Sequence, residues 1–339
     1  MPRAFFRRLF LPLPALLLAL AAGAAAGRGL PRPTGPAEQA RAFLEILEPA
    51  ARRQARHPWA DPSRRRWNFV PGPREGLSLA EQSPEARLAL HALLRSVLSE
   101  AGYLKASAVM ALEAVLRELE GSEQRDPERY WIAFYGEPGG GAPWALRFEG
   151  HHLSLNLTFR DGEAFPTPMF FGSNPARVLS GEQAGLQVLA GEEEAFRHFL
   201  EALTPDQRAA ARAADEAWPE ILMRPGVDAL PPDRPLGLEV EDLDPGQFDR
   251  FLDLVAVFVD RLEPALAAQE WDRLLGVPDE AFRFRFVWAG SAEPGARHAW
   301  RIEGPDLILE YVAFQNGGNH VHTVWRGGLR EFGGPAEDS

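Results

Sequence analysis

The chain has 339 residues, of which 45% are hydrophobic and 25% charged, and it contains no cysteine. This composition is typical of a folded globular protein with a large core, and it excludes disulfides, thiolate metal sites and cysteine nucleophiles. The formal net charge of −12 at pH 7 disfavours nucleic acid and anionic membrane surfaces as partners. Lys105 is the sole lysine, which excludes most Schiff-base and P-loop chemistry.

Residues 1–26 have the pattern of a cleaved export signal. Three arginines precede an apolar run at residues 9–20, and Ala24 and Ala26 fit a cleavage site. The pair Arg7-Arg8 followed by Leu-Phe-Leu resembles a twin-arginine signal, with a general secretory signal as the alternative. The apolar run is shorter than the ~20 residues that span a bilayer. We therefore expect an extracytoplasmic (periplasmic or secreted) protein without stable membrane insertion after cleavage.

Helical and strand patterns follow one another in blocks along the rest of the chain. Apolar residues at helical spacing predict helices at 88–98 and 104–120, followed by strands at 130–135, 144–160 and 167–171. The order then recurs, with helices near 195–211 and 247–275 and strands near 281–289, 298–314 and 320–326. Helices grouped before antiparallel strands predict an α+β fold.

Three sequence blocks also recur in the same order and at nearly the same separation. Residues 41–52 resemble 197–208, the helix start at Ser83-Pro84 resembles that at Asp244-Pro245, and residues 147–155 resemble 301–309. This pattern predicts a tandem duplication with halves at 40–178 and 197–326, packed about a pseudo-twofold axis. Residues 27–39 would then be a linker, 179–196 a connection and 327–339 a C-terminal tail.

Four segments carry a family resemblance. They are RWNFVP at 66–71, FEGHHLSLN at 148–156, FFGSNP at 170–175 and QNGGNHVHTVWR at 315–326. Together they resemble the family catalogued as DUF3500, exported bacterial proteins of unknown function. The resemblance implies that nearly the whole mature chain is one family unit, and it implies no particular reaction.

Four of the eight histidines lie in two short motifs. Side chains two apart on a strand share a face, so His320 and His322 project together. The same alternation places His152 and Asn156 on one polar face, and the repeat makes Glu310 the counterpart of Asn156. These residues predict a three-histidine, one-carboxylate site for one Zn, Fe, Mn or Cu ion. The alternative is that the His-x-His pair only forms hydrogen bonds in a polar cleft.

Other polar residues are candidate ligand contacts. Arg147 and Glu149 share a strand face in a pattern that the second half repeats, which fits a structural ion pair or a substrate contact. Asn156, Trp325 and Arg326 are further candidates for ligand binding.

Two further residues receive a structural interpretation. The alternation places His151 on the face of the leucines that follow it, so we expect it to pack in the core. Glu113 lies on a predicted helix, where its side chain could reach a cleft, although we expect it to be exposed.

These patterns leave three classes of function. The first is an exported metal-dependent enzyme, hydrolytic or oxidative, whose catalytic residues the pattern does not name. The alternative is a non-catalytic extracytoplasmic protein that binds a small-molecule ligand between the halves. A structural partner in a surface assembly is least favoured, because such a protein does not need polar residues that converge on strand faces.

Overall fold

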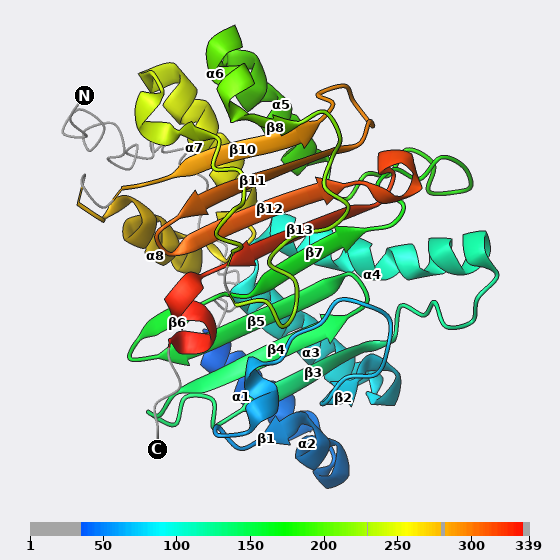
Figure 1. Ribbon diagram of the computed structural model, residues 1–339. Helices are drawn as coiled ribbons and strands as arrows, with labels where there is room; N and C mark the ends of the chain where they lie inside the picture. The colour runs from blue at the N-terminus through cyan, green and yellow to red at the C-terminus, as the bar shows by residue number, and fades with distance from the viewer. Residues whose placement is uncertain (1–34, 229, 279–281, 335–339) are drawn as a thin grey trace, which may run out of the picture.

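The structure is a computed structural model that describes residues 35–228, 230–278 and 282–334. The predicted export signal lies outside these residues. One large sheet runs through the molecule and helices cover one of its faces (Figure 1). Among the described residues, no helix combines the length and the apolar character needed to cross a membrane.

Several of the helices begin where a capping side chain and a proline meet. Ser83, Thr204 and Asp244 each accept a hydrogen bond from a backbone amide three residues ahead, and each is followed by a proline in the first turn. The predicted helices at 195–211 and 247–275 are each two helices, because Pro205 and Pro264 start new ones. The α-helices are α1 (Pro36–Ile46), α2 (Pro49–Ala55), α3 (Pro84–Val97), α4 (Glu100–Glu120), α5 (Ala190–Ala202), α6 (Pro205–Ala211), α7 (Pro245–Val259) and α8 (Pro264–Leu275).

Thirteen strands of the described chain form the sheet. Its main path runs β1-β3-β4-β5-β7-β13-β12-β11-β10-β8, with β2 beside β3, β6 beside β5 and β9 beside β10. Only β1–β3 and β8–β10 pair in parallel within the described residues. The strands are β1 (Arg56–His57), β2 (Leu77–Ser78), β3 (Tyr130–Tyr135), β4 (Trp144–Gly150), β5 (Leu153–Arg160), β6 (Glu163–Phe165), β7 (Met169–Ser173), β8 (Arg212–Ala214), β9 (Leu238–Glu239), β10 (Arg285–Gly290), β11 (His298–Gly304), β12 (Leu307–Ala313) and β13 (Val321–Arg326). The predicted α+β class is confirmed.

Two predicted strands are in fact hairpins. The stretch 144–160 divides into β4 and β5 at a turn formed by His151 and His152, and the stretch 298–314 divides into β11 and β12 at Pro305-Asp306. His152 has a φ of 60°, in the left-handed region that non-glycine residues seldom occupy. Such strained residues often mark functional sites.

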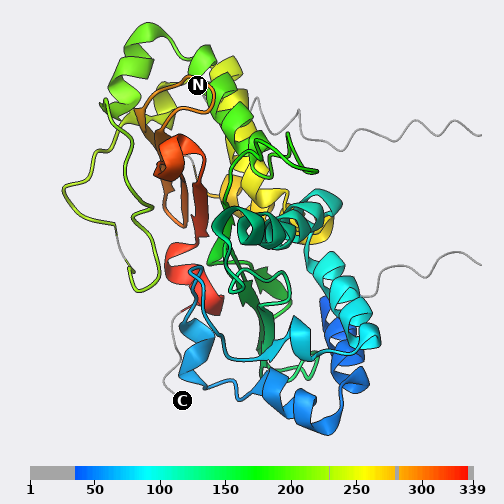
Figure 2. The same ribbon diagram turned by 90° about the vertical axis from the view of Figure 1, so that its right-hand side faces the viewer.

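The two faces of the sheet are covered differently. The helices pack on one face, where Leu153, Leu155 and Leu157 join the main core. Two long segments lie on the other face, and we call them the first crossing segment (residues 58–76) and the second crossing segment (residues 215–228). Figure 2 shows both on the side opposite the helices. A smaller apolar cluster that includes Phe69 and Ile221 packs them onto the sheet.

A buried ion cluster lies on the helix face near the middle of the sheet. Glu192 at the start of α5 contacts the ammonium of Lys105 and lies 2.7 Å from the guanidinium of Arg261. Glu192 and Arg261 are almost fully buried. The cluster therefore joins α4 and α5 to the turn between α7 and α8.

Candidate metal centre

Three histidines from distant parts of the chain meet at the centre of the sheet. His152 lies in the turn between β4 and β5, His320 directly precedes β13, and His322 is on β13. The Nε2 atom of His152 is 3.0 Å from Nε2 of His320 and 3.3 Å from Nε2 of His322. All three candidate ligand atoms lie within 4.8 Å of one another. We call this group the three-histidine cluster.

Hydrogen bonding alone does not satisfy these ring nitrogens. Nε2 of His152 carries either one proton or one lone pair, yet it faces two imidazole nitrogens. Nδ1 of His322 lies 2.7 Å from the carboxylate of Glu220, so in the neutral ring Nδ1 holds the proton and Nε2 presents a lone pair. His152 can then make a good hydrogen bond to only one of its neighbours. A cation at the meeting point would accept a lone pair from all three rings.

The spacing also fits a metal ion. Zinc–nitrogen bonds of about 2.0–2.1 Å in a tetrahedral site place neighbouring ligand nitrogens roughly 3.3 Å apart. The two separations measured from His152, 3.0 and 3.3 Å, are close to that value. Three ligands would leave one position of a tetrahedral site free for water or substrate.

Burial keeps two of the histidines neutral. Desolvation, helped by the neighbouring imidazoles and Arg125, lowers the pKa of His152 well below its ordinary value. The same causes lower the pKa of His320 to about 3. The neutral imidazole is the form that binds metal ions, so both rings are ready to act as ligands at neutral pH.

The backbone of β7 provides space for the ring of His152. Gly172 on β7 is the register partner of His322, and its amide donates to the carbonyl of His152 at 2.7 Å. A Cβ atom on Gly172 would lie 2.9 Å from Cγ and Cδ2 of His152. Only a glycine at this position leaves the imidazole where it is.

Aromatic rings enclose the cluster on the face of the sheet opposite the helices. Phe69 of the first crossing segment stacks on Phe170 at 4.1 Å and meets the ring of His322 edge-on at 4.9 Å. Its carbonyl accepts a hydrogen bond from the amide of His152 at 2.9 Å. The first crossing segment therefore both positions His152 and shields His322 from water.

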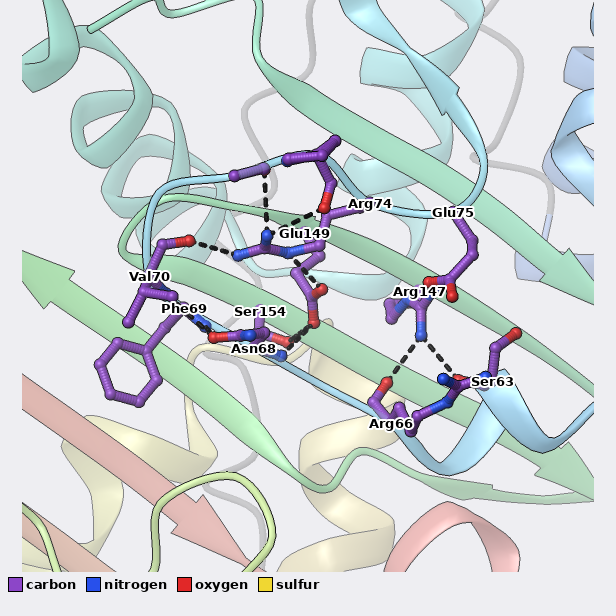
Figure 3. A network of polar contacts seen from close by, with 12 residues as sticks. Ser63, Arg66, Asn68, Phe69, Val70, Arg74, Glu75, Arg147, Glu149 and Ser154 are labelled. Carbon is purple, nitrogen blue, oxygen red and sulfur yellow. Dashed lines mark hydrogen bonds and ion pairs between the residues drawn. The ribbon is translucent and has the colours of Figure 1, made fainter. Parts of the chain in front are cut away.

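Polar contacts hold the first crossing segment in this position (Figure 3). The carboxylate of Glu149 forms an ion pair with Arg74 at 2.7 Å and accepts hydrogen bonds from the Asn68 amide at 2.8 Å and the Ser154 hydroxyl at 2.7 Å. Although burial raises the pKa of Glu149, nearby arginines and these donors oppose the shift.

The guanidinium of Arg147 binds the same segment. It donates to the carbonyls of Ser63 and Arg66 at 2.7 and 2.6 Å and lies 3.1 Å from Glu75. Arg147 and Glu149 are both buried. Each forms its ion pair with a residue of the first crossing segment, Arg147 with Glu75 and Glu149 with Arg74. Asn156 is likewise buried, and its amide nitrogen donates to Ser154 and to the carbonyl of Pro168.

Glu310 lies outside the three-histidine cluster. Its two carboxylate oxygens accept hydrogen bonds from the amides of Leu222 and Met223, at 3.2 and 2.8 Å, and it lies 3.8 Å from Arg301. The expected carboxylate ligand therefore holds the second crossing segment instead. The repeat argument placed Glu310 on the same face of the sheet as the histidines, but it could not show that backbone amides bind both of its carboxylate oxygens.

Trp325 and Arg326 point to opposite faces of the sheet. Trp325 is buried in the core on the helix face, away from the histidines. Arg326 donates to the carbonyls of Met223 and Val227 at 2.9 Å and pairs with Glu331. Both residues are used in packing and in holding the second crossing segment.

His151 is not in the leucine core. It occupies the turn beside His152, with the ring centroids 3.8 Å apart. Its Nδ1 contacts the carboxylate of Glu113 and lies 3.1 Å from the guanidinium of Arg125. Glu113 is therefore buried in this contact and is not exposed as expected. The alternation argument failed here because it treated the turn as part of a strand.

A pocket of about 280 Å³ opens next to His151. It lies between the first crossing segment and the end of α4. Its lining residues are Pro71, Gly72, Pro73, Glu113, Gln124, Arg129 and His151.

Comparison with known proteins agrees with this picture at the level of the family. A family model described as "Protein of unknown function (DUF3500)" matches residues 34–334. The chain belongs to the DUF3500 family. None of the curated proteins and none of the solved structures compared with it matches the chain. The matched span of this DUF3500 protein includes all three histidines of the cluster.

Sequence reasoning missed two residues and one contact that shape the centre of this DUF3500 protein. Glu220 belongs to a crossing segment with no regular pattern, and no local signal connects it to His322. Gly172 follows the apolar run at residues 169–171 within β7, and a glycine inside a strand signals close approach of another group. The contact between Glu113 and His151 depends on how α4 lies over the hairpin.

Proposed function

We propose that this DUF3500 protein binds one divalent transition metal through His152, His320 and His322 and uses it in hydrolytic or oxidative chemistry on a small molecule. The observation that carries the proposal is the convergence of three buried ring nitrogens whose hydrogen bonds cannot all be satisfied. Three imidazoles without a carboxylate suit zinc or copper better than manganese. When bound, such an ion supplies Lewis acidity or an activated water.

The contact of Glu220 with His322 supports the same proposal. A histidine that binds a metal through one ring nitrogen usually donates the N–H of its other ring nitrogen to a carboxylate or carbonyl, which fixes the ring orientation. Glu220 is only 27% exposed in its side chain and lies 2.7 Å from Nδ1 of His322. It would orient the ring without entering the first coordination shell.

Metal analysis of the purified protein tests this proposal. We expect about one metal ion per chain in the wild type and none in the double variant His320→Ala/His322→Ala, with the helical circular dichroism signal retained. The control is His198→Ala, which removes an exposed histidine on α5 and should keep the ion. Stoichiometric metal in the double variant would contradict the proposal.

The alternative function is a non-catalytic protein that binds a small ligand. The pocket beside His151 supports it, because a polar pocket of this size needs no metal to bind a ligand. Hydrolysis of p-nitrophenyl acetate and p-nitrophenyl phosphate, and oxygen consumption with a reductant, distinguish the two. Turnover that disappears in the double variant favours the enzyme, whereas bound metal without turnover favours the binding protein.

We also propose that the chain arose by duplication of one unit. Each half contains two helices, two short strands, a second helix pair and then an antiparallel meander. The hairpin partners Arg147 and Asn156 in one half correspond to Arg301 and Glu310 in the other. Superposition of the two halves should align β4–β5 on β11–β12; alignment of either hairpin on a different element would contradict the proposal.

Export remains a proposal that the N-terminal pattern supports. We expect the mature chain to begin near Gly27 outside the cytoplasm. N-terminal sequencing of the native protein checks this, and Met1 on cytoplasmic protein would contradict it.

A further inference from the structure

The pocket beside His151 contains a positive charge that the protein itself does not neutralise. Arg129 lines this pocket, and its guanidinium makes no hydrogen bond or ion pair with the described residues. By contrast, neighbouring Arg125 pairs with Glu120 and contacts His151. A guanidinium without an acidic partner in a pocket is suited to a carboxylate or phosphate, which it can bind with two parallel hydrogen bonds.

The rest of the pocket defines a second recognition point. His151 and Glu113 line it together and contact each other. An imidazole can accept a hydrogen bond from, or donate one to, a hydroxyl or amino group, and a carboxylate can accept one from either. Pro71 and Pro73 provide apolar surface, which suits a short carbon skeleton.

The pocket is also next to the three-histidine cluster. The ring of His151 separates it from His152, and the two ring centroids are 3.8 Å apart. Its volume of about 280 Å³ is just below the usual range for ligand pockets, roughly 300–1,000 Å³. An occupant must therefore be small.

We propose that this pocket binds a small organic anion that also carries a hydroxyl or amino group. Arg129 holds the carboxylate or phosphate, and the pair of His151 and Glu113 binds the second polar group. The assignment of this molecule as the substrate of the metal centre rests on the proposed function, but its binding through Arg129 requires no metal.

Isothermal titration calorimetry on the full mature chain tests the proposal. The probes are L-malate for a hydroxy acid and glycerol 3-phosphate for a phosphate ester, with glycerol as the neutral control. Each is titrated into zinc-loaded and EDTA-treated protein. We expect saturable binding of at least one anion in both forms, and weakening of at least about tenfold in Arg129→Gln, which loses charged hydrogen bonds.

The matched control is Arg53→Gln. Arg53 is an exposed arginine on α2 outside this pocket, so the variant loses the same charge and should bind the anions as the wild type does. The proposal is overturned if neither anion binds saturably, or if Arg129→Gln binds as tightly as Arg53→Gln. Binding that EDTA abolishes and that Arg129→Gln preserves would place the anion on the metal and would also overturn it.

The same titration separates this proposal from the metal proposal. Binding that depends on Arg129 and persists in His320→Ala/His322→Ala supports the pocket even if metal analysis finds no ion. Conversely, stoichiometric metal without anion binding leaves the metal centre standing and rejects the pocket.

Discussion

Replacement of Gly172 by alanine should disturb the candidate metal centre while leaving all three proposed ligands in the sequence. The added Cβ would lie 2.9 Å from two atoms of the His152 ring, whereas ordinary contacts begin at 3.4 Å. The ring must therefore move by about 0.5 Å, since β7 is tied to the carbonyl of His152 by a 2.7 Å hydrogen bond. Ligand distances in metal sites tolerate only about 0.2 Å.

We expect two separate effects of Gly172→Ala. Overpacking of the core should lower the free energy of unfolding by about 1–3 kcal/mol. Displacement of His152 should weaken metal binding by about 10–100-fold, the usual effect of changing a residue that orients a ligand. Chemical denaturation of metal-free protein measures the first, and competition with a chromophoric chelator measures the second.

Gly304→Ala is the matched control. Gly304 is at the end of β11, and a Cβ there would lie 2.3 Å from the ring of Phe284. β12 separates β11 from β13, and Gly304 is at the opposite end of β11 from Ala299, which is in register with Val312 and His322. This variant should lose stability while keeping the wild-type metal affinity. If Gly172→Ala binds metal as tightly as Gly304→Ala does, the role assigned to Gly172 in positioning His152 is refuted.

Three further substitutions test other contacts. Glu220→Ala should weaken metal binding by about 10–100-fold in the same chelator assay, because it removes the carboxylate that orients one ligand ring. Glu310→Gln should keep stoichiometric metal and lower the free energy of unfolding by about 1–3 kcal/mol, because the amide side chain keeps one acceptor oxygen and turns a donor NH2 toward the other backbone amide. Loss of the ion would restore this residue as a ligand. Glu192→Gln should cost about 3–5 kcal/mol at pH 7 by breaking its buried ion pairs. Burial alone would raise the pKa of Glu192, but the charges of Lys105 and Arg261 hold that pKa below its ordinary value of 4.5. The stability that this carboxylate contributes is therefore present above pH 4.5 and is lost as the pH falls through the lower pKa of the folded state. Denaturation curves of wild type and Glu192→Gln should therefore converge in acid, and a constant difference would count against the assignment.

The sequence alone was sufficient for the class of fold because the relevant signals are local. Helical spacing, caps such as Ser83-Pro84 and the alternation of leucines in β5 each depend on neighbours a few residues away. The two long predicted strands failed at His151-His152 and Pro305-Asp306, where a turn lies between residues of strand-like composition. The same error placed His151 in the core.

The sequence also determined that His320 and His322 project to the same side, because residues two apart on an extended chain share a side. Only the tertiary structure decided that His152 joins them and that Glu310 does not. His152 and His322 are 170 residues apart, and they meet because β7 pairs with β13 at one particular register. That register depends on the packing of the whole sheet, which no local pattern encodes. The same holds for the position of Glu220, which lies on a segment that crosses the face opposite the helices.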